Sequence, residues 1–209
     1  MQFYDLSRPL TPATAVYPGD TPVTVTHQLR LRDGALCNLS SIEFSVHAGT
    51  HVDAPRHCLD AGPGIESIPL ASLIGRARVV TLPAVSAITL AVVQALDLTC
   101  VTRLLVHTRH SDVADDVFDP ALVHFTPDAA AWLGAAGLRL IGTDAPSVDP
   151  LQSADLAAHL AFMAGGVVIV ENLRLRDVPD GDYELIALPI CIAGSDGAPA
   201  RVVLRSWVE

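Results

Sequence analysis

The segment from Val46 to His57 reads V-H-A-G-T-H-V-D-A-P-R-H and gathers residues that could bind a metal ion. It contains His47, His51 and His57, together with the carboxylate of Asp53. Imidazole nitrogens and carboxylate oxygens are the usual ligands of zinc, and they also suit manganese and iron. Because four such groups lie on one short segment rich in turn residues, they can converge on a cation. We interpret the segment as a metal-binding loop, against the alternative of a solvated loop that happens to be rich in histidine.

Two residues within this segment shape its backbone. Gly49 allows the chain to approach an ion closely or to adopt a positive φ angle. Pro55 stiffens the exit from the segment and keeps Ala54 out of the helical region. Both properties are typical of a loop that holds ligands in fixed positions.

Further candidate residues stand at the ends of predicted elements downstream. A continuous apolar run, 167–170, predicts a buried strand that ends in Glu171. A carboxylate there is costly unless it is paired or bound to a cation, although a strand-end Glu that reaches solvent is the alternative. His159 lies on a predicted helix, 155–163, with Ser153 as its cap. The intervening D-A-P-S-V-D-P, 144–150, suits either a rigid site loop or a plain tight turn.

One further group of residues and one single aromatic residue could support a site. His107, His110 and Asp112 form a second polar cluster, which we expect to lie on the surface or behind the first cluster because no turn gathers them. Tyr17 precedes a Pro-Gly-Asp turn and would be an aromatic at a loop tip. It could pack on its own turn or face a substrate.

The order of predicted elements mixes strands with short helices. It predicts a single α/β domain, 1–209, with a curved mixed β-sheet flanked by helices. The strand at 23–31 alternates apolar and polar residues, so we expect it to be half-buried, and a strand at 38–47 should project His47 from its polar side. The other predicted strands are 3–6, 76–82, 103–108, 138–142, 183–190 and 201–208, and the other predicted helices are 68–74, 89–96 and 126–136, with Thr89 and Thr126 as caps.

The composition limits the class of partner. The 209 residues are 50% hydrophobic and 17% charged, which suits a sizeable core, and the net charge of −10 argues against binding to nucleic acid or to an anionic membrane surface.

The N-terminus has no pattern of an export signal, and the most hydrophobic window, 160–170, is too short to span a bilayer. The scattered cysteines predict free thiols in a reducing compartment, so we expect a cytoplasmic protein. They are Cys37, Cys58, Cys100 and Cys191.

Taken together, these motifs resemble the metal-dependent, cyclase-like amidohydrolase family, and within it the bacterial kynurenine formamidase (arylformamidase) branch. The similar stretches run almost from end to end of the chain. They are D-L-S-R-P-L, Y-P-G-D-T-P, H-A-G-T-H-V-D-A-P-R-H, L-I-G-T-D-A-P-S-V-D-P and V-E-N-L. The tail, with G-D-Y-E-L-I-A-L-P and A-R-V-V-L-R, resembles the formamidase branch in particular.

The resemblance implies a site with two divalent metal ions per subunit, zinc in the first place with manganese as an alternative. His47 and His51 would hold the first ion, and Asp53 would bridge both. His159 would hold the second ion, and Glu171 would contact the pair. The same resemblance makes His57 the proton donor and acceptor.

The resemblance also implies an activity and an assembly. The activity is hydrolysis of N-formyl-L-kynurenine to L-kynurenine and formate by metal-activated water, in tryptophan degradation. Tyr17 stands where formamidases usually have a Trp that meets the substrate, so the aromatic face is kept with a different size and an added hydroxyl. The implied fold is of the swivelling β/β/α kind, and the implied assembly is a homodimer or a dimer of dimers.

Two other functions stay open at this level. One is another amide or lactam hydrolase of the same family, such as an isatin hydrolase. The other is a non-catalytic protein that binds a metal or a ligand, although His57 as a proton shuttle would have no use there. A serine nucleophile is disfavoured, because the sequence has no G-x-S-x-G elbow.

Overall fold

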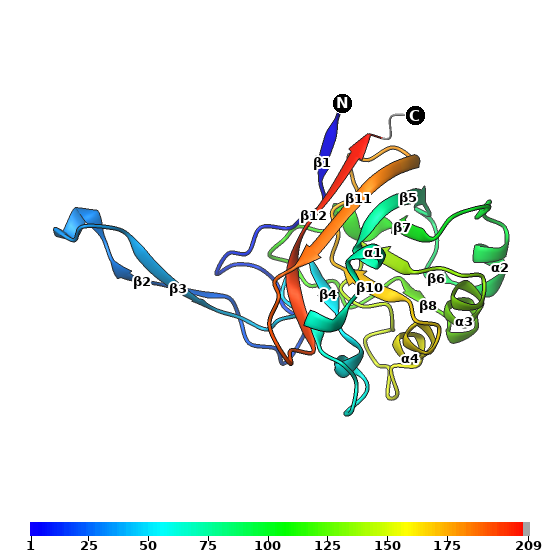
Figure 1. Ribbon diagram of the computed structural model, residues 1–209, viewed down its shortest axis with the longest axis horizontal. Coiled ribbons are helices and arrows are strands. Elements are labelled where there is room, and N and C mark those ends of the chain that lie inside the picture. Colours follow the sequence, from blue (N-terminus) through cyan, green and yellow to red (C-terminus); the bar gives the residue numbers. More distant parts are fainter. Residues whose placement is uncertain (207–209) are drawn as a thin grey trace.

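Seven strands close into a ring in the computed structural model, which describes residues 1–206 (Figure 1). The ring is mixed and strongly curved, as the sequence predicts, and an eighth strand, β1 (Phe3–Asp5), extends it beside β12. In spatial order the ring consists of β12 (Gly197–Ser206), β11 (Gly181–Pro189), β5 (Ile74–Thr81), β7 (Arg103–His107), β9 (Leu140–Thr143), β10 (Val168–Glu171) and β4 (His51–Asp53), which pairs again with β12.

In the parallel half of the ring, β5-β7-β9-β10, the strands β7, β9 and β10 are short and largely buried, whereas β5 is longer and partly exposed. Their near-continuous apolar sequences follow from having both faces covered. On the inner face lies a core cluster that includes Leu105, Val170 and Leu185. On the outer face a second cluster, which includes Leu104, Ile141 and Phe162, packs against the helices.

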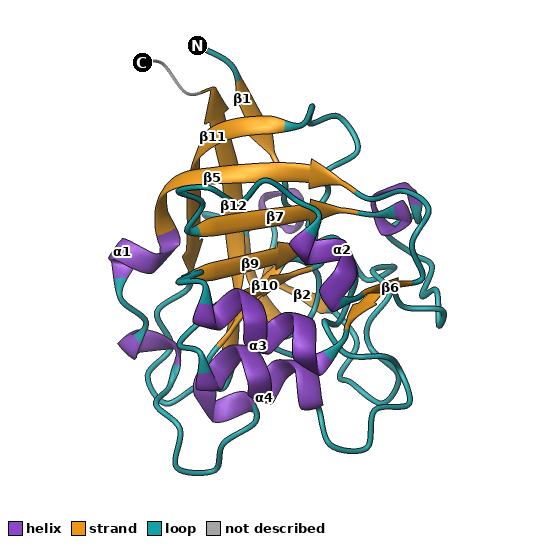
Figure 2. Cartoon of the chain, turned by 90° about the vertical axis from the view of Figure 1, so that its right-hand side faces the viewer, coloured by secondary structure: helices purple, strands orange, loops and turns teal. Residues whose placement is uncertain are grey.

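The helices α2 (Leu90–Gln94), α3 (Pro127–Ala135) and α4 (Ala157–Ala164) cover that outer face, and the short α1 (Leu70–Leu73) leads into β5 (Figure 2). α3 and α4 pack closely because a glycine from each faces the other. A Cβ atom at Gly165 would lie 2.9 Å from the Cα of Gly134. Within residues 1–206 no helix combines the length and apolar character needed to cross a bilayer.

One element leaves the body altogether. β2 (Thr24–Leu29) and β3 (Leu39–Glu43) form an antiparallel hairpin that projects far from the ring (Figure 1). The prediction of a half-buried strand at 23–31 is wrong, since five of the six residues of β2 are exposed. The alternation is present, but within this chain its apolar side faces no core. We call the segment Thr24–Glu43 the arm.

Other boundaries differ from the prediction for local reasons. The second arm strand ends at Glu43, so His47 lies in a turn and not at the end of a strand. Thr126 precedes α3 as predicted, but its side chain makes no cap bond. The helix α4 starts later than predicted, after Leu156, and Ser153 accepts the backbone N–H of Leu156 at 3.0 Å from before the helix. The last strand begins at Gly197 rather than Arg201 because pairing with β4 extends it, and the predicted residues 207 and 208 lie outside the described range.

Candidate metal centre

The centre is assembled on β4, the short strand that links the two ends of the ring. In the antiparallel ladder Glu171 of β10 faces His51, while Gly197 of β12 faces Asp53. Since side chains two residues apart in a strand point to the same side, His51 and Asp53 project together. The ring thus places Glu171 beside both of them, although it is distant in sequence. It also means that part of the predicted metal-binding loop is a buried strand.

Three buried side-chain atoms at this point have no hydrogen-bond partner among the described residues. They are Nε2 of His51, Nε2 of His159 and Oδ2 of Asp53. Nε2 of His51 lies 3.3 Å from Asp53 Oδ1 and 3.4 Å from Glu171 Oε2. Nε2 of His159 lies 3.5 Å from Asp53 Oδ2 and 3.3 Å from Glu171 Oε1. Buried polar atoms normally have partners, so this set is the donor arrangement that suits a cation.

The orientation of both imidazole rings is fixed from behind. Nδ1 of His51 lies 2.9 Å from the carbonyl oxygen of Gly49, to which it can donate. Nδ1 of His159 lies 2.6 Å from Oδ2 of Asp149, a carboxylate that also accepts the backbone N–H of His159. Because Nδ1 donates in each ring, Nε2 is the nitrogen left for a metal, which is the usual supporting arrangement of metal-binding histidines.

His47 approaches the same centre from the turn before β4. Its Nδ1 lies 3.0 Å from Oδ1 of Asp53, and its Nε2 lies 3.0 Å from Oδ2 of Asp196. Two sets of potential ligand atoms therefore share Asp53, each with its members within 4.8 Å of one another. One set is His47, His51 and Asp53, and the other is Asp53, His159 and Glu171. The structure thus brings together all five residues predicted as metal ligands.

The buried carboxylates of the centre favour a positive charge beside them. Burial disfavours the imidazolium form of His51, but the nearby carboxylates of Asp53 and Glu171 outweigh it and raise its pKa to about 10. The pKa of His159 is raised well above its usual value against the same desolvation, by Asp149, Asp53 and Glu171. Burial would raise the pKa of Asp53, yet the three histidines hold it well below the usual range. Without a metal, protons on imidazoles balance the buried carboxylates; a divalent ion would do so instead.

His57 lies beside the centre, outside the two sets that share Asp53, and forms a third set of potential ligand atoms with His47 and Asp196. It ends a 3-10 turn, Pro55–His57, and its ring centroid lies 4.2 Å from that of His47 and 5.5 Å from that of His159. Burial lowers the pKa of His57, despite the opposing charge of Asp53. A neutral imidazole at the edge of a cationic centre can accept a proton and return it.

A cavity of about 250 Å³ opens onto these residues. His47, His51, His57, His159 and Glu171 line one part of it. The remaining wall combines apolar and aromatic side chains with charged ones. The apolar and aromatic residues are Val16, Tyr17, Val113, Val117, Phe118 and Leu156, and the charged residues include Arg8, Asp20, Asp115 and Asp119. The hydroxyl of Tyr17 donates to the carbonyl of Leu151 at 3.2 Å, and its ring meets that of Phe118 edge to face at 5.6 Å. The cavity fits a small aromatic molecule that carries polar groups.

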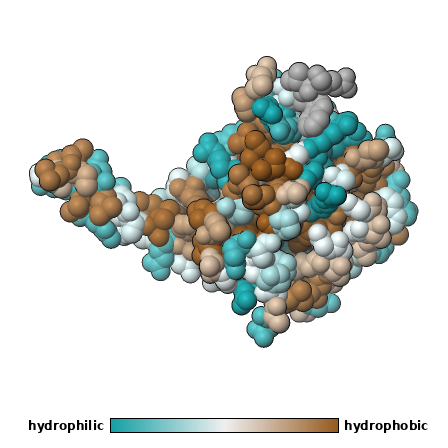
Figure 3. Space-filling view, viewed as in Figure 1, coloured by the Kyte–Doolittle hydropathy of each residue, from teal (hydrophilic) through white to brown (hydrophobic). Residues whose placement is uncertain are grey.

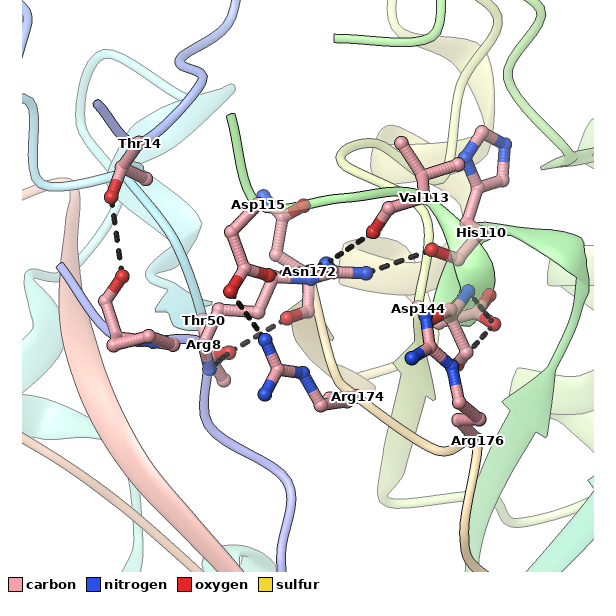
Figure 4. Close-up of polar contacts among 12 residues, drawn as sticks. Arg8, Thr14, Thr50, His110, Val113, Asp115, Asp144, Asn172, Arg174 and Arg176 are labelled. Atoms are coloured by element: carbon pink, nitrogen blue, oxygen red, sulfur yellow. Dashed lines mark hydrogen bonds and ion pairs between the residues drawn. The ribbon is translucent and has the colours of Figure 1, made fainter. Parts of the chain in front are cut away.

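The second predicted polar cluster is divided. His110 is buried and lines the cavity, but its Nε2 accepts the backbone N–H of Val123, so it supports the wall. Asp112 is exposed and His107 is not among the residues that line the cavity. Figure 4 shows that the guanidinium of Arg8 donates to the backbone oxygens of His110 and Val113 and so fixes this wall.

Three further residues at the site were not identified from the sequence. Arg8 and Asp196 gave no signal in isolation, because their neighbours come from remote segments. Asp149 lies in the Asp- and Pro-rich stretch 144–150, which suited either a site loop or a tight turn. Its contact with His159 favours the first interpretation.

Several known proteins are similar to this chain in sequence or in fold. A family model described as a putative cyclase matches residues 4–150. A kynurenine formamidase of Salinibacter ruber is 45% identical over 207 residues, which cover 98% of each chain. A solved structure described as a potential metal-dependent hydrolase with cyclase activity is 31% identical, with a TM-score of 0.87 over 100% of this chain and 99% of that one. Isatin hydrolase A from Labrenzia aggregata, 22% identical, shares the fold, with a TM-score of 0.84 over 98% and 93%.

Proposed function

The chain belongs to the putative cyclase family, and we propose that it acts there as a kynurenine formamidase, hydrolysing N-formyl-L-kynurenine to L-kynurenine and formate. It is a hydrolytic enzyme of the arylformamidase type, which acts on a linear amide. The observation behind the proposal is the set of three buried, unpartnered atoms on His51, Asp53 and His159 at the head of an aromatic cavity. Full-length similarity to a formamidase then favours this substrate.

The metal centre would hold two divalent ions that share Asp53. His47 and His51 would complete one position, and His159 would complete the other, with Glu171 between them. Nitrogen and oxygen donors in this mixture suit zinc best and manganese second. When bound, the ions supply a water of lowered pKa and polarise the formyl carbonyl.

The protein groups would perform the proton transfers. His57, neutral near pH 7 because burial lowers its pKa, would take a proton from the attacking water. It would return this proton to the departing aniline nitrogen, so that the C–N bond breaks with formate and a free amine as products. The buried carboxylates of Asp53 and Glu171 would keep the ions in place throughout.

The aromatic part of the substrate would lie against Tyr17. Its edge-to-face pair with Phe118 and its hydrogen bond to Leu151 hold its ring in the cavity wall. A Tyr in the position of the Trp usual in formamidases keeps an aromatic face there, with a different size and an added hydroxyl.

We also propose that the chain works as a homodimer or a dimer of dimers. The arm supports this, because an isolated two-stranded hairpin is at best marginally stable in water. Its exposed apolar side chains give it a surface that another copy could cover, as Figure 3 shows along the projection. They are Leu29, Leu31, Leu36, Leu39 and Ile42. Residues 1–209 would form one hydrolase domain, with the closed ring as the core of a swivelling β/β/α fold. Four free cysteines favour the cytoplasm as its location.

The test is metal removal combined with a choice of substrates. Protein stripped by a chelator should lose activity on N-formyl-L-kynurenine and recover it with zinc or manganese. His57→Ala should still bind metal but lose at least about 100-fold in turnover, the usual contribution of a positioned acid–base group. His107→Ala, at a histidine that does not line the cavity, is the matched control. Full activity of metal-free protein would contradict the proposal. Hydrolysis of isatin without hydrolysis of N-formyl-L-kynurenine would show that the protein is an isatin hydrolase instead.

A further inference from the structure

Asp196 stands directly behind His47, on the side away from Asp53. It lies in the loop between β11 and β12, and its backbone carbonyl accepts the N–H of Ala54 at 2.9 Å. Its Oδ2 lies 3.0 Å from Nε2 of His47, while Nδ1 of the same ring lies 3.0 Å from Asp53. Both nitrogens face carboxylates, so a protonated ring can donate to both, whereas a ring bound to an ion through one nitrogen keeps one N–H and can donate only through the other.

The start of β12 is shaped to receive this ring. A Cβ atom on Gly197 would lie 2.8 Å from Cε1 of His47 and 3.1 Å from the backbone oxygen of Val52. A side chain at position 197 would therefore push His47 away from the centre. The absence of a side chain lets the ring approach the strand closely, with Nε2 3.0 Å from the carboxylate of the preceding residue, Asp196.

We propose that Asp196 is a positioning residue for the metal centre: by accepting the Nε2 proton of His47 it leaves Nδ1 as the nitrogen that faces the ion. This rests on the metal centre of the proposed function. It also makes His47 the reverse of its two neighbours, because His51 and His159 donate through Nδ1 and present Nε2.

The two ends of the centre then differ in rigidity. Asp149 is buried, with 2% of its surface exposed, and accepts the backbone N–H groups of Ala158 and His159 as well as the His159 ring. The side chain of Asp196 is 48% exposed, and its contacts are with His47 at 3.0 Å and His57 at 3.8 Å. The position that includes His47 therefore depends on a support open to solvent, whereas the position that includes His159 depends on a buried one. We expect the first to bind its ion less tightly.

The experiment is a titration of metal-free protein with Zn²⁺ against a chromophoric chelator, in wild type, Asp196→Asn and Asp60→Asn. Loss of a supporting carboxylate commonly costs 10–100-fold in metal affinity. Asp196→Asn should weaken one of two binding steps by about this factor, leave the other unchanged and still reach the wild-type stoichiometry. Asp60, exposed on the segment after His57, provides the charge-matched control and should change neither step.

Asp196→Glu keeps a carboxylate and should restore affinity to within a few-fold, which separates positioning from a general effect on folding. Unchanged steps in Asp196→Asn would overturn the proposal. Loss of one ion even at saturating Zn²⁺ would also overturn it, because Asp196 would then be a ligand itself. If the wild-type protein binds no Zn²⁺, both the positioning role of Asp196 and the proposed function are refuted. If the wild-type protein binds Zn²⁺ and the Asp196 variants bind it equally well, only the positioning role is refuted.

Discussion

Glu171, the last residue of β10, lies opposite His51 of β4, and its Oε2 is 3.4 Å from the Nε2 of that histidine. Both residues belong to strands whose ladder partners are fixed by closure of the ring. A site built on paired strands holds its ligands more precisely than one built on loops. The cation site is therefore a consequence of how the sheet closes.

Glu171→Gln should weaken the whole centre. The amide keeps the size of the side chain and can still accept the backbone N–H of Val148, which bonds Oε1 at 2.7 Å. It removes one of two buried negative charges near both metal positions, so zinc affinity and activity should each fall by at least about 100-fold. Chelator competition and the formamidase assay measure the two effects. Asp128→Asn, at an exposed carboxylate in the first turn of α3, serves as control, and wild-type affinity in the Glu171 variant would exclude its role as a ligand.

Metal binding should release protons. Despite the opposing effect of burial, the carboxylates of Asp53 and Glu171 raise the pKa of His51 to about 10, so this ring is protonated at pH 7 in metal-free protein. A protonated nitrogen cannot bind an ion, and the proton must leave. Zinc affinity should therefore fall about tenfold for each unit of decreasing pH per proton displaced. Calorimetry in buffers of different ionisation enthalpy measures the release, and identical heats in all of them would show that the imidazole of His51 carries no extra proton before the metal binds.

Most residues of the candidate centre could be proposed from the sequence pattern, and His159 from the family resemblance, but their supports could not. The alternation of apolar runs and turn residues predicted most strands to within a few residues, because buried strands leave a strong periodic pattern. His47, His51 and Asp53 were recognisable because they are close in sequence, and Glu171 because a carboxylate after a buried strand needs an explanation. Asp196 lacked any such local signal.

The prediction for the arm failed for a different physical reason. An alternating pattern shows that one face of a strand is apolar, but not which surface will cover it. In Thr24–Leu29 that face points away from the body of the same chain. The start of β12 was missed similarly, since Gly197 to Ala200 become a strand through pairing with β4 and β11, which no local pattern encodes.

Tyr17 should act in substrate binding. Tyr17→Phe loses the hydroxyl that donates to Leu151 but keeps the ring beside Phe118, so KM should change by less than about threefold. Tyr17→Ala removes the aromatic face, and the loss of one aromatic contact of about 1 kcal/mol or more corresponds to a KM about 5–10-fold higher. Steady-state kinetics on N-formyl-L-kynurenine distinguish these results. Equal KM values in the alanine variant and the wild type would show that the aryl group binds elsewhere.

The arm should carry the contact between copies. Leu39 and Ile42 are 47% and 50% exposed, so replacing both by Asp costs the isolated chain little. Burying these charges against a second copy would be costly, and sedimentation velocity should show a dimer for the wild type and a monomer for Leu39→Asp/Ile42→Asp. Leu70→Asp, a substitution at a 64% exposed leucine on α1, controls for added charge and should stay dimeric. A double variant that remains dimeric would place the interface on another surface, because two buried, unpaired carboxylates in each copy are incompatible with a contact through the arm.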